Sequence, residues 1–103
     1  MIYLLIKQSI KNYVSWKNSF DQFKEYRKIG GELSCEIYQA NGKRHEHIIL
    51  SQWKNEESAL EFLQSQSFKM IKELEDEEPI AIQFLPPKSY WISNFTVNHQ
   101  LLQ

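Results

Sequence analysis

ELSCEIYQANGKRHEHIILSQW, residues 32–53, contains two runs of strand-forming residues on either side of Asn41-Gly42. Asn-Gly between such runs is the strongest short signal for a β-hairpin, because both residues accept the positive φ angles that a two-residue turn requires. The stretch therefore predicts one strand over residues 32–40 and a second over residues 44–53, with Asn41-Gly42 as the turn.

A two-residue turn would bring four polar side chains to one face of this hairpin. It would place His47 opposite Glu36 and His45 opposite Tyr38, and side chains of alternate residues share a face. A histidine beside a glutamate is a common arrangement for a general base, which here would take a proton from a phenol or an enol. We therefore predict His47, His45, Glu36 and Tyr38 as catalytic candidates.

Two other interpretations of these residues stay open. Two imidazoles and a carboxylate would also suit a divalent metal that keeps a position open for water or substrate. A cross-strand His–Glu pair can instead stabilise a solvated or interface face of the sheet, by ~0.2–1 kcal/mol, without any chemistry. We assign neither a metal nor a cofactor to the chain. His99, near the end of the chain, is expected at the surface.

Upstream of the hairpin, the residues predict a strand and an amphipathic helix. MIYLLIKQ (1–8) is a short apolar run, which favours a strand. Asn12 offers an N-cap, and Gly30-Gly31 ends the helix that follows. One face of this helix carries aromatic residues at helical spacing, which are Tyr13, Trp16, Phe20 and Phe23.

Downstream of the hairpin, the same order of elements is repeated. Asn55 can cap a second helix, which restarts at Ser65 or Ser67. Its apolar face is expected to carry Ala59, Phe62, Leu63, Phe68, Ile71 and Leu74. Pro79 breaks the helix, and IAIQFL (80–85) predicts a fourth strand.

The resulting order, β-α-β-β-α-β, consists of two split β-α-β units. It predicts an α+β, ferredoxin-like fold, with a four-stranded antiparallel sheet and two helices on one face. We expect residues 1–86 to form this domain. The aromatic segment 87–103 is expected to be a C-terminal extension, which could add a strand to its own sheet or to a partner's sheet.

The first strand is apolar on both of its faces, and the last strand repeats this pattern. Ile2, Leu4 and Ile6 alternate with Tyr3 and Leu5. Two helices cover one face of such a sheet, and the other face would leave a large apolar patch in water. We therefore predict a homodimer that packs sheet against sheet and forms a dimeric α/β barrel.

Composition excludes several classes of function. The 103 residues carry a formal net charge of -1, without the clustered lysines and arginines that bind nucleic-acid backbones. No segment reaches the ~20 apolar residues of a membrane helix. Cys35, the single cysteine, is expected to be buried in the sheet and inert. No Gly-rich phosphate loop or Cys-x-x-Cys is present. We expect a cytoplasmic protein that binds neither nucleic acid nor membrane.

Several of these segments resemble a known family. In NYVSWKNSFDQFKEYRKIGG (12–31), an aromatic pair leads into W-K-x-x-F-D, followed by an arginine and a glycine stop. HIILSQWKNEESALEFLQSQSFK (47–69) ends a strand in Trp and continues with A-x-x-F and S-x-x-F, and PIAIQFL (79–85) follows. Together, over roughly residues 1–85, they resemble the antibiotic biosynthesis monooxygenase-like domains of the dimeric α/β-barrel superfamily.

The resemblance implies a pocket between sheet and helices, and cofactor-independent oxygenation of quinols or polyketide-like aromatics. We expect a small aromatic ligand there, with a wall formed by Trp16, Phe20, Phe23 and Phe62. Arg27 would bind an anionic group of the ligand, or it would form a surface salt bridge. Helical spacing also suits these aromatic residues to the core. The haem-degrading branch is disfavoured, because its Asn is missing from the first strand and Lys72 stands where that branch has its haem-ligating His.

Two functions stay open on the sequence alone. The first is oxidation of a small aromatic or quinol-type compound without a cofactor. The alternative is a non-catalytic module on the same dimeric scaffold, which binds a small molecule or a partner. A closed aromatic cavity with a polar residue inside would favour the enzyme, whereas a filled core with both histidines in solvent would favour the module.

Overall fold

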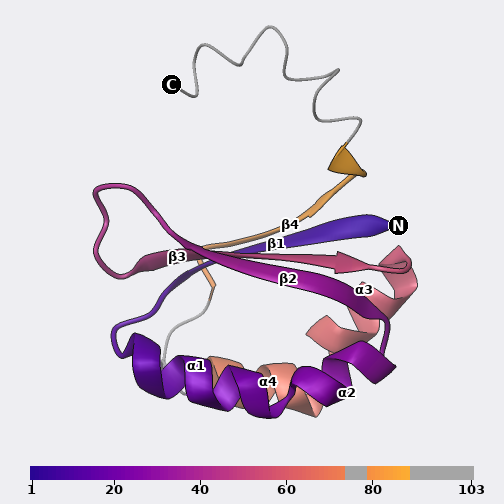
Figure 1. The fold of residues 1–103 in the computed structure, drawn as a ribbon, viewed down its shortest axis with the longest axis horizontal. Helices are drawn as coiled ribbons and strands as arrows, with labels where there is room; N and C mark the ends of the chain where they lie inside the picture. Colours follow the sequence, from indigo (N-terminus) through magenta and orange to yellow (C-terminus); the bar gives the residue numbers. More distant parts are fainter. Residues whose placement is uncertain (74–78, 89–103) are drawn as a thin grey trace, which may run out of the picture.

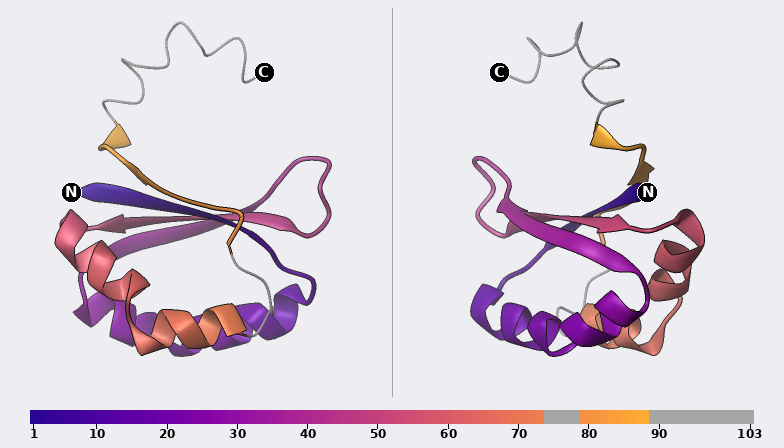
Figure 2. Two further views of the ribbon diagram at one scale, coloured as in Figure 1. Left: turned by 180° about the vertical axis from the view of Figure 1, so that it is seen from behind. Right: turned by 45° about the vertical axis from the view of Figure 1, so that its right-hand side comes forward.

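The computed structural model describes residues 1–73 and 79–88. Its antiparallel sheet has the spatial order β2-β3-β1-β4 and is formed by β1 (Ile2–Ser9), β2 (Glu32–Gln39), β3 (Glu46–Trp53) and β4 (Ala81–Leu85). The helices of this part of the chain are α1 (Tyr13–Gln22), α2 (Lys24–Ile29), α3 (Glu56–Leu63) and α4 (Gln66–Glu73), and they lie on one face of the sheet (Figures 1 and 2). The predicted ferredoxin-like fold is confirmed.

Each of the two predicted helical stretches consists of two short helices. Phe23 interrupts the first stretch, because its backbone N–H bonds to the carbonyl of Phe20, three residues back, and its φ and ψ of -95° and 8° leave the helical region. Ser65 separates α3 from α4 and caps α4, since its Oγ accepts the N–H of Phe68 at 3.2 Å. The predicted caps Asn12 and Asn55 are confirmed, with Oδ1 accepting a backbone N–H at 3.1 and 2.8 Å.

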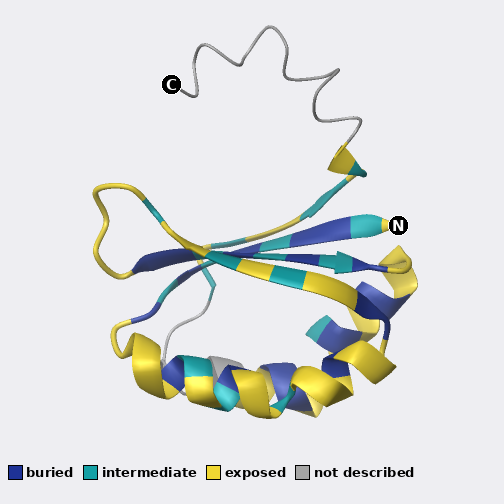
Figure 3. Cartoon of the chain, in the orientation of Figure 1, coloured by how far each residue is buried: buried dark blue, intermediate teal, exposed yellow. Residues whose placement is uncertain are grey.

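The hydrophobic core lies between the sheet and the helices. Leu4 and Ile6 of β1 are buried in it, and the helices contribute mainly aromatic residues. Figure 3 shows where buried residues lie along the chain. Its buried members are Leu4, Ile6, Ile10, Trp16, Phe20, Ile49, Trp53, Ala59, Phe62 and Phe68. The edge strand β2 is largely exposed by comparison (Figure 3).

The predicted register of the β2–β3 hairpin is wrong. The turn at Asn41-Gly42 does form, because Lys43 N–H bonds to the carbonyl of Ala40 at 3.2 Å and Gly42 has a φ of 75°. A second turn follows at once, in which Glu46 N–H bonds to the carbonyl of Lys43. An ion pair between Lys43 and Glu46 at 3.4 Å accompanies this second turn. The ladder therefore begins later on β3 than predicted.

The second turn changes which side chains of β2 and β3 share a face. His47 lies opposite Gln39 and Tyr38 lies opposite Ile48. The observed register differs from the predicted register by an odd number of residues. Side chains of β2 and β3 that were predicted to share a face therefore lie on opposite faces of the sheet. Glu36 consequently lies opposite Leu50 instead of His47.

The face of the sheet away from the helices carries an apolar area. Its central pair is Leu5 and Leu50, directly opposite each other on β1 and β3, with Ile48 beside them. An ion pair of 2.7 Å between Lys7 and Glu46 borders this area. We call the residues Tyr3, Leu5, Ile48, Leu50 and Leu85 the open-face patch. No helix within residues 1–73 and 79–88 is long and apolar enough to cross a membrane.

Candidate functional site

The longer loop separates the four residues that the sequence predicts as catalytic. Glu36 and Tyr38 lie on the open face, where the Tyr38 hydroxyl donates to the Glu36 carboxylate, and this bond raises the pKa of Tyr38. His47 points to the helix side, and His45 lies in the exposed loop before β3. The structure therefore brings together His45 with His47, and Glu36 with Tyr38, but it does not form the predicted His–Glu pair.

His47 lies in a defined pocket on the helix side of the sheet. The residue is 7% exposed, and its ring stacks on Tyr13 with 5.0 Å between centroids and 15° between planes. Its Nδ1 lies 2.9 Å from the backbone oxygen of His45. A carbonyl oxygen only accepts, so in the neutral ring Nδ1 carries the proton and Nε2 keeps its lone pair. No residue of the described ranges bonds to Nε2, which leaves a base available.

A groove runs between α1 and the edge strand β2, beside this histidine. It consists of two adjoining hollows of about 450 and 470 Å³ that share Tyr13 and Ile37 in their walls. The hollow near the hairpin turns also contains Arg44, His45 and His47. A buried apolar cavity of about 150 Å³ takes up benzene, so the groove has room for an aromatic molecule. We call these two hollows together the α1–β2 groove.

Positive charge predominates along the α1–β2 groove. Its basic residues are Lys11, Lys17, Lys24, Arg27, Lys28 and Arg44, and its acidic residues are Asp21 and Glu32. Lys17 is neutralised by Asp21 at 2.7 Å, and Arg27 is neutralised by Glu32 at 3.1 Å. Lys28 also pairs with Glu25, at 3.9 Å. The basic side chains that line the groove still outnumber the acidic ones, which favours an anionic or acidic ligand over a cationic one.

Cys35 lines the same groove but does not provide a nucleophile there. The residue is only partly buried, rather than buried as the sequence suggests. Burial nevertheless raises the pKa of its thiol to about 12, and the carboxylate of Glu32 adds to this shift. The thiolate is the reactive form of cysteine, so this shift supports the expectation that Cys35 is inert.

The predicted aromatic wall is divided between the core and two separate hollows. Trp16 and Phe20 stack at 4.8 Å in the core, and Phe20 also borders the α1–β2 groove. Phe23 is partly buried and packs against the core from the break between α1 and α2. Phe62 borders a different pocket, on the other side of α2.

Arg27 is committed to a buried ion pair. Its side chain is 3% exposed, and its Nε lies 3.2 and 3.1 Å from the two carboxylate oxygens of Glu32. Nη1 donates to the carbonyl of Phe20 at 2.6 Å, and the guanidinium lies 3.7 Å above the Phe20 ring. Burial raises the pKa of Glu32 while Arg27 opposes this shift. These contacts assign Arg27 a structural role at the end of the groove.

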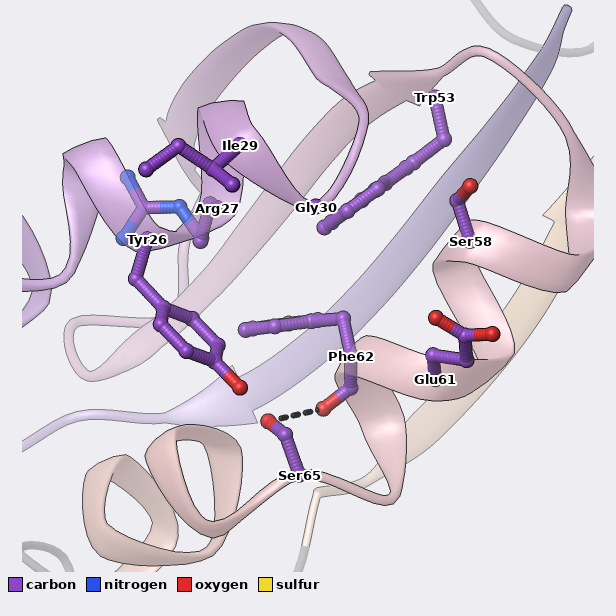
Figure 4. Close-up of a pocket in the computed structure, with 9 residues that line it drawn as sticks. All are labelled: Tyr26, Arg27, Ile29, Gly30, Trp53, Ser58, Glu61, Phe62 and Ser65. Atoms are coloured by element: carbon purple, nitrogen blue, oxygen red, sulfur yellow. Dashed lines mark hydrogen bonds between the residues drawn. The ribbon is translucent and has the colours of Figure 1, made fainter.

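A second, smaller pocket of about 190 Å³ lies between α2 and α3 (Figure 4). The stacked rings of Trp53 and Phe62, 5.2 Å apart, form its inner wall. Tyr26 on α2 and Glu61 on α3 stand at opposite sides of it. Ser65 borders it as well, but its hydroxyl donates to the Phe62 carbonyl at 2.6 Å. This pocket holds no histidine, so the α1–β2 groove is the better candidate for proton transfer.

Sequence reasoning missed two residues beside His47. Tyr13 was expected only on the aromatic face of its helix, yet its ring covers the imidazole. Gln8 is the second residue, which lies directly opposite His47 on β1 and is 1% exposed. The alternation of side chains along the first strand indicates the position of Gln8, because Gln8 shares a face with the apolar Leu4 and Ile6. In residues 1–73 and 79–88, no three His, Cys, Asp or Glu side chains are grouped so as to hold a metal ion.

Comparison with solved structures places the fold among known proteins. The chain is similar to a conserved protein from Methanosarcina mazei Go1, with a TM-score of 0.64 and 23% identity, covering 82% of this chain and 89% of that one. It is also similar to two proteins that carry the provisional name of antibiotic biosynthesis monooxygenase. The protein from Bordetella bronchiseptica has a TM-score of 0.67 and 12% identity, covering 82% and 94%. The protein from Caulobacter crescentus CB15 has a TM-score of 0.65 and 12% identity, covering 82% and 86%.

These neighbours establish the fold. Many of the structural neighbours are antibiotic biosynthesis monooxygenase-like proteins with the ferredoxin-like fold, as the sequence motifs suggest. At identities of this size, the likeness concerns the fold alone. No protein-family model and no curated protein matches the chain.

Proposed function

We propose, from the fold shared with antibiotic biosynthesis monooxygenase-like proteins, that this chain oxidises a phenol- or quinol-type aromatic compound without a bound cofactor. The reaction takes place in the α1–β2 groove. One observation carries the proposal: His47 is held by the His45 carbonyl in the tautomer that leaves Nε2 as a base, at the wall of a hollow of about 470 Å³. The positive charge along the groove suits the phenolate that this base would generate.

The proposed reaction consumes dioxygen and balances without a further reductant. A phenol with a free ring position reacts with O₂ to give a quinone and water. One oxygen atom replaces the ring hydrogen, and the other leaves as water with that hydrogen and the phenolic hydrogen. The ring is oxidised and dioxygen is reduced. His47 removes the phenolic proton, because the resulting phenolate is richer in electrons and transfers them to O₂ more readily.

Oxygen uptake with a panel of naphthols and hydroquinones tests this function. Wild-type protein should consume O₂ above the buffer rate, and His47→Gln should reduce the rate by about 10²–10⁴-fold, the usual contribution of a general base. His45→Gln is the matched control, since this exposed histidine contributes its backbone carbonyl and its substitution should leave most of the activity. Equal rates for wild type and His47→Gln would exclude His47 as the base.

A non-catalytic binding module is the second candidate, and one observation favours it. Glu36 lies on the open face, so the predicted carboxylate partner of His47 is not beside its imidazole. In this case the groove would bind an acidic aromatic compound without turnover. Calorimetry under air separates the two candidates: a stable complex whose ligand is recovered unchanged supports the module, and ligand conversion supports the oxidase.

We also propose that the protein is a cytoplasmic homodimer that pairs through the open-face patch. Leu5 and Leu50 lie opposite each other at the centre of this patch, with Ile48 beside them. A second copy related by a two-fold axis would present the same patch, and the two sheets would cover each other. The segment 87–103, of which all but the first two residues lie outside the described ranges, stays a predicted C-terminal extension.

A further inference from the structure

Two buried nitrogen donors lack a hydrogen-bond partner within residues 1–73 and 79–88. They are Nε2 of Gln8 and Nε1 of Trp16, and both residues are 1% exposed. Buried polar groups are nearly always paired in folded proteins, and an unpaired donor destabilises the folded state. Trp53 shows the usual arrangement in the same core, since its Nε1 donates to Ser51 Oγ at 2.8 Å. The two unpaired donors therefore call for a specific explanation.

Both donors belong to the neighbourhood of His47. Gln8 is its cross-strand partner on β1, and directly opposite side chains in an antiparallel pair are in contact range. Trp16 is reached through Tyr13, whose ring lies 6.2 Å from the Trp16 ring and 5.0 Å from the imidazole. Gln8 is therefore adjacent to His47 on the sheet, and Trp16 lies one ring beyond Tyr13 on α1. Both donors are buried, and neither residue lines a hollow of the α1–β2 groove.

We propose that Gln8 and Trp16 donate hydrogen bonds to the oxygen of the bound aromatic compound while His47 removes its proton. The O–H bond breaks, the proton moves to Nε2 of His47, and the electron pair stays on the oxygen. Donors that are already in place stabilise such a developing oxyanion more than water does, because they need no reorganisation. The inference rests on the proposed function and narrows its substrate to a hydroxylated ring that can form a phenolate.

Tyr13 controls access to these donors. Its ring borders both hollows of the α1–β2 groove and covers the face of His47, while 37% of the residue is exposed. A ligand ring that reaches Gln8 and Trp16 must displace the Tyr13 ring and stack on the imidazole in its place. The substrate is therefore a flat molecule whose oxygen leads into the core.

The variant Gln8→Leu tests the assignment, because leucine has a similar size and no donor. We expect its Tm to rise above that of wild type, since an unpaired donor is removed. We expect its affinity for 1-naphthol, measured anaerobically, to fall by about 5- to 150-fold, the loss for one hydrogen bond to a charged or buried group. Naphthalene is the matched ligand without oxygen and should bind the two proteins equally. A lower Tm, or equal loss of both ligands, would overturn the assignment.

Indole N–H resonances provide a readout for Trp16 that does not depend on turnover. Under anaerobic titration with 1-naphthol, the Nε1 proton of Trp16 should move downfield, whereas that of Trp53, already bonded to Ser51, should stay in place. An unchanged Trp16 resonance at saturation would overturn its role. If naphthol binds and causes these shifts but no oxygen is consumed, the proposed oxidation is contradicted, and the assignment of Gln8 and Trp16 as donors to the ligand is supported. A complete absence of naphthol binding would overturn both the proposed oxidation and the donor assignment.

Discussion

The guanidinium of Arg27 and the carboxylate of Glu32 form a buried ion pair across the turn from α2 to β2, with Nε 3.1 Å from Oε2. The same guanidinium stacks on Phe20 and donates to its carbonyl. One side chain therefore connects α1, α2 and the start of β2. This arrangement fixes the edge strand relative to α1, and so it fixes one end of the α1–β2 groove.

Arg27→Met should destabilise the fold by about 3–5 kcal/mol, because it leaves the Glu32 charge buried without a partner. Urea denaturation measures the change. Lys28→Met is the matched control on the same helix. Its ion pair with Glu25 is 3.9 Å long and exposed, so the loss should stay below about 1 kcal/mol. Equal losses in the free energy of unfolding for the two variants would show that the buried ion pair contributes no more to stability than the exposed one.

The loss in Arg27→Met should depend on pH. Burial already raises the pKa of Glu32, and removal of Arg27 removes the main opposing contribution. A raised folded-state pKa means that the native state holds the Glu32 proton more tightly than the unfolded chain does. The stability that this proton contributes is complete below the unfolded pKa, and it is lost as pH rises through the folded pKa. The deficit relative to wild type should therefore be smaller near pH 4.5 than at pH 7. A deficit independent of pH would contradict this assignment.

Gly31→Ala should destabilise the fold by roughly 1–3 kcal/mol. Gly31 has a φ of 117°, which L-residues rarely adopt, and a Cβ there would lie 3.0 Å from Cβ and Oγ of Ser58. Gly30→Ala, one residue earlier, meets only ordinary contacts at an ordinary φ and should change the free energy of unfolding by less than about 1 kcal/mol in either direction. Thermal melts of both variants would reveal the difference, and similar melting temperatures would count against the strain at Gly31.

Cys35 should react slowly with iodoacetamide in the folded protein. Its thiol has a pKa raised to about 12, so the thiolate fraction at pH 8 is on the order of a thousandfold below that of an ordinary cysteine. The rate should climb steadily with pH up to the onset of alkaline unfolding. In urea the same cysteine should react at the ordinary rate, which serves as the control. Rapid labelling of native protein at pH 8 would refute the shifted pKa.

Leu50→Asp should convert the proposed dimer to a monomer. The substitution places a charge beside Leu5 at the centre of the open-face patch, where a second copy would bury it. Leu60→Asp is the control, because Leu60 is an exposed leucine on α3, away from the sheet. Sedimentation velocity at micromolar concentration should give a dimer for wild type and Leu60→Asp and a monomer for Leu50→Asp. A wild-type monomer would remove the basis of the proposed pairing.

The fold could be predicted from the sequence because local signals agreed with one another. Asn12 and Asn55 cap helices as expected, and the Asn41-Gly42 turn forms where its composition requires it. The register of the β2–β3 hairpin could not be predicted, because the second turn, from Lys43 to Glu46, depends on contacts that no short sequence motif indicates. That turn adds residues to the loop and reverses the faces of the hairpin.

The candidate site was therefore predicted only in part. His47 and His45 border the groove, but Glu36 and Tyr38 lie on the far side of the sheet. Trp16 and Phe20 lie on the buried face of α1, as the helical spacing predicts. Phe23 instead lies at the break after α1, and Tyr13 is 37% exposed and stacks on the imidazole of His47. Which ring of the helix enters the core and which stacks on His47 depends on the sheet that the helix packs against, and helical spacing alone does not reveal it.

The most direct test of the account is to map where an aromatic hydroxyl compound binds. Backbone amide NMR shifts recorded during an anaerobic titration with 1-naphthol identify the residues that respond. The account predicts that the largest shifts cluster at Tyr13, Ile37 and His47, around the α1–β2 groove. Shifts that cluster instead at Tyr26 and Phe62, or an absence of any saturable shift, would contradict it.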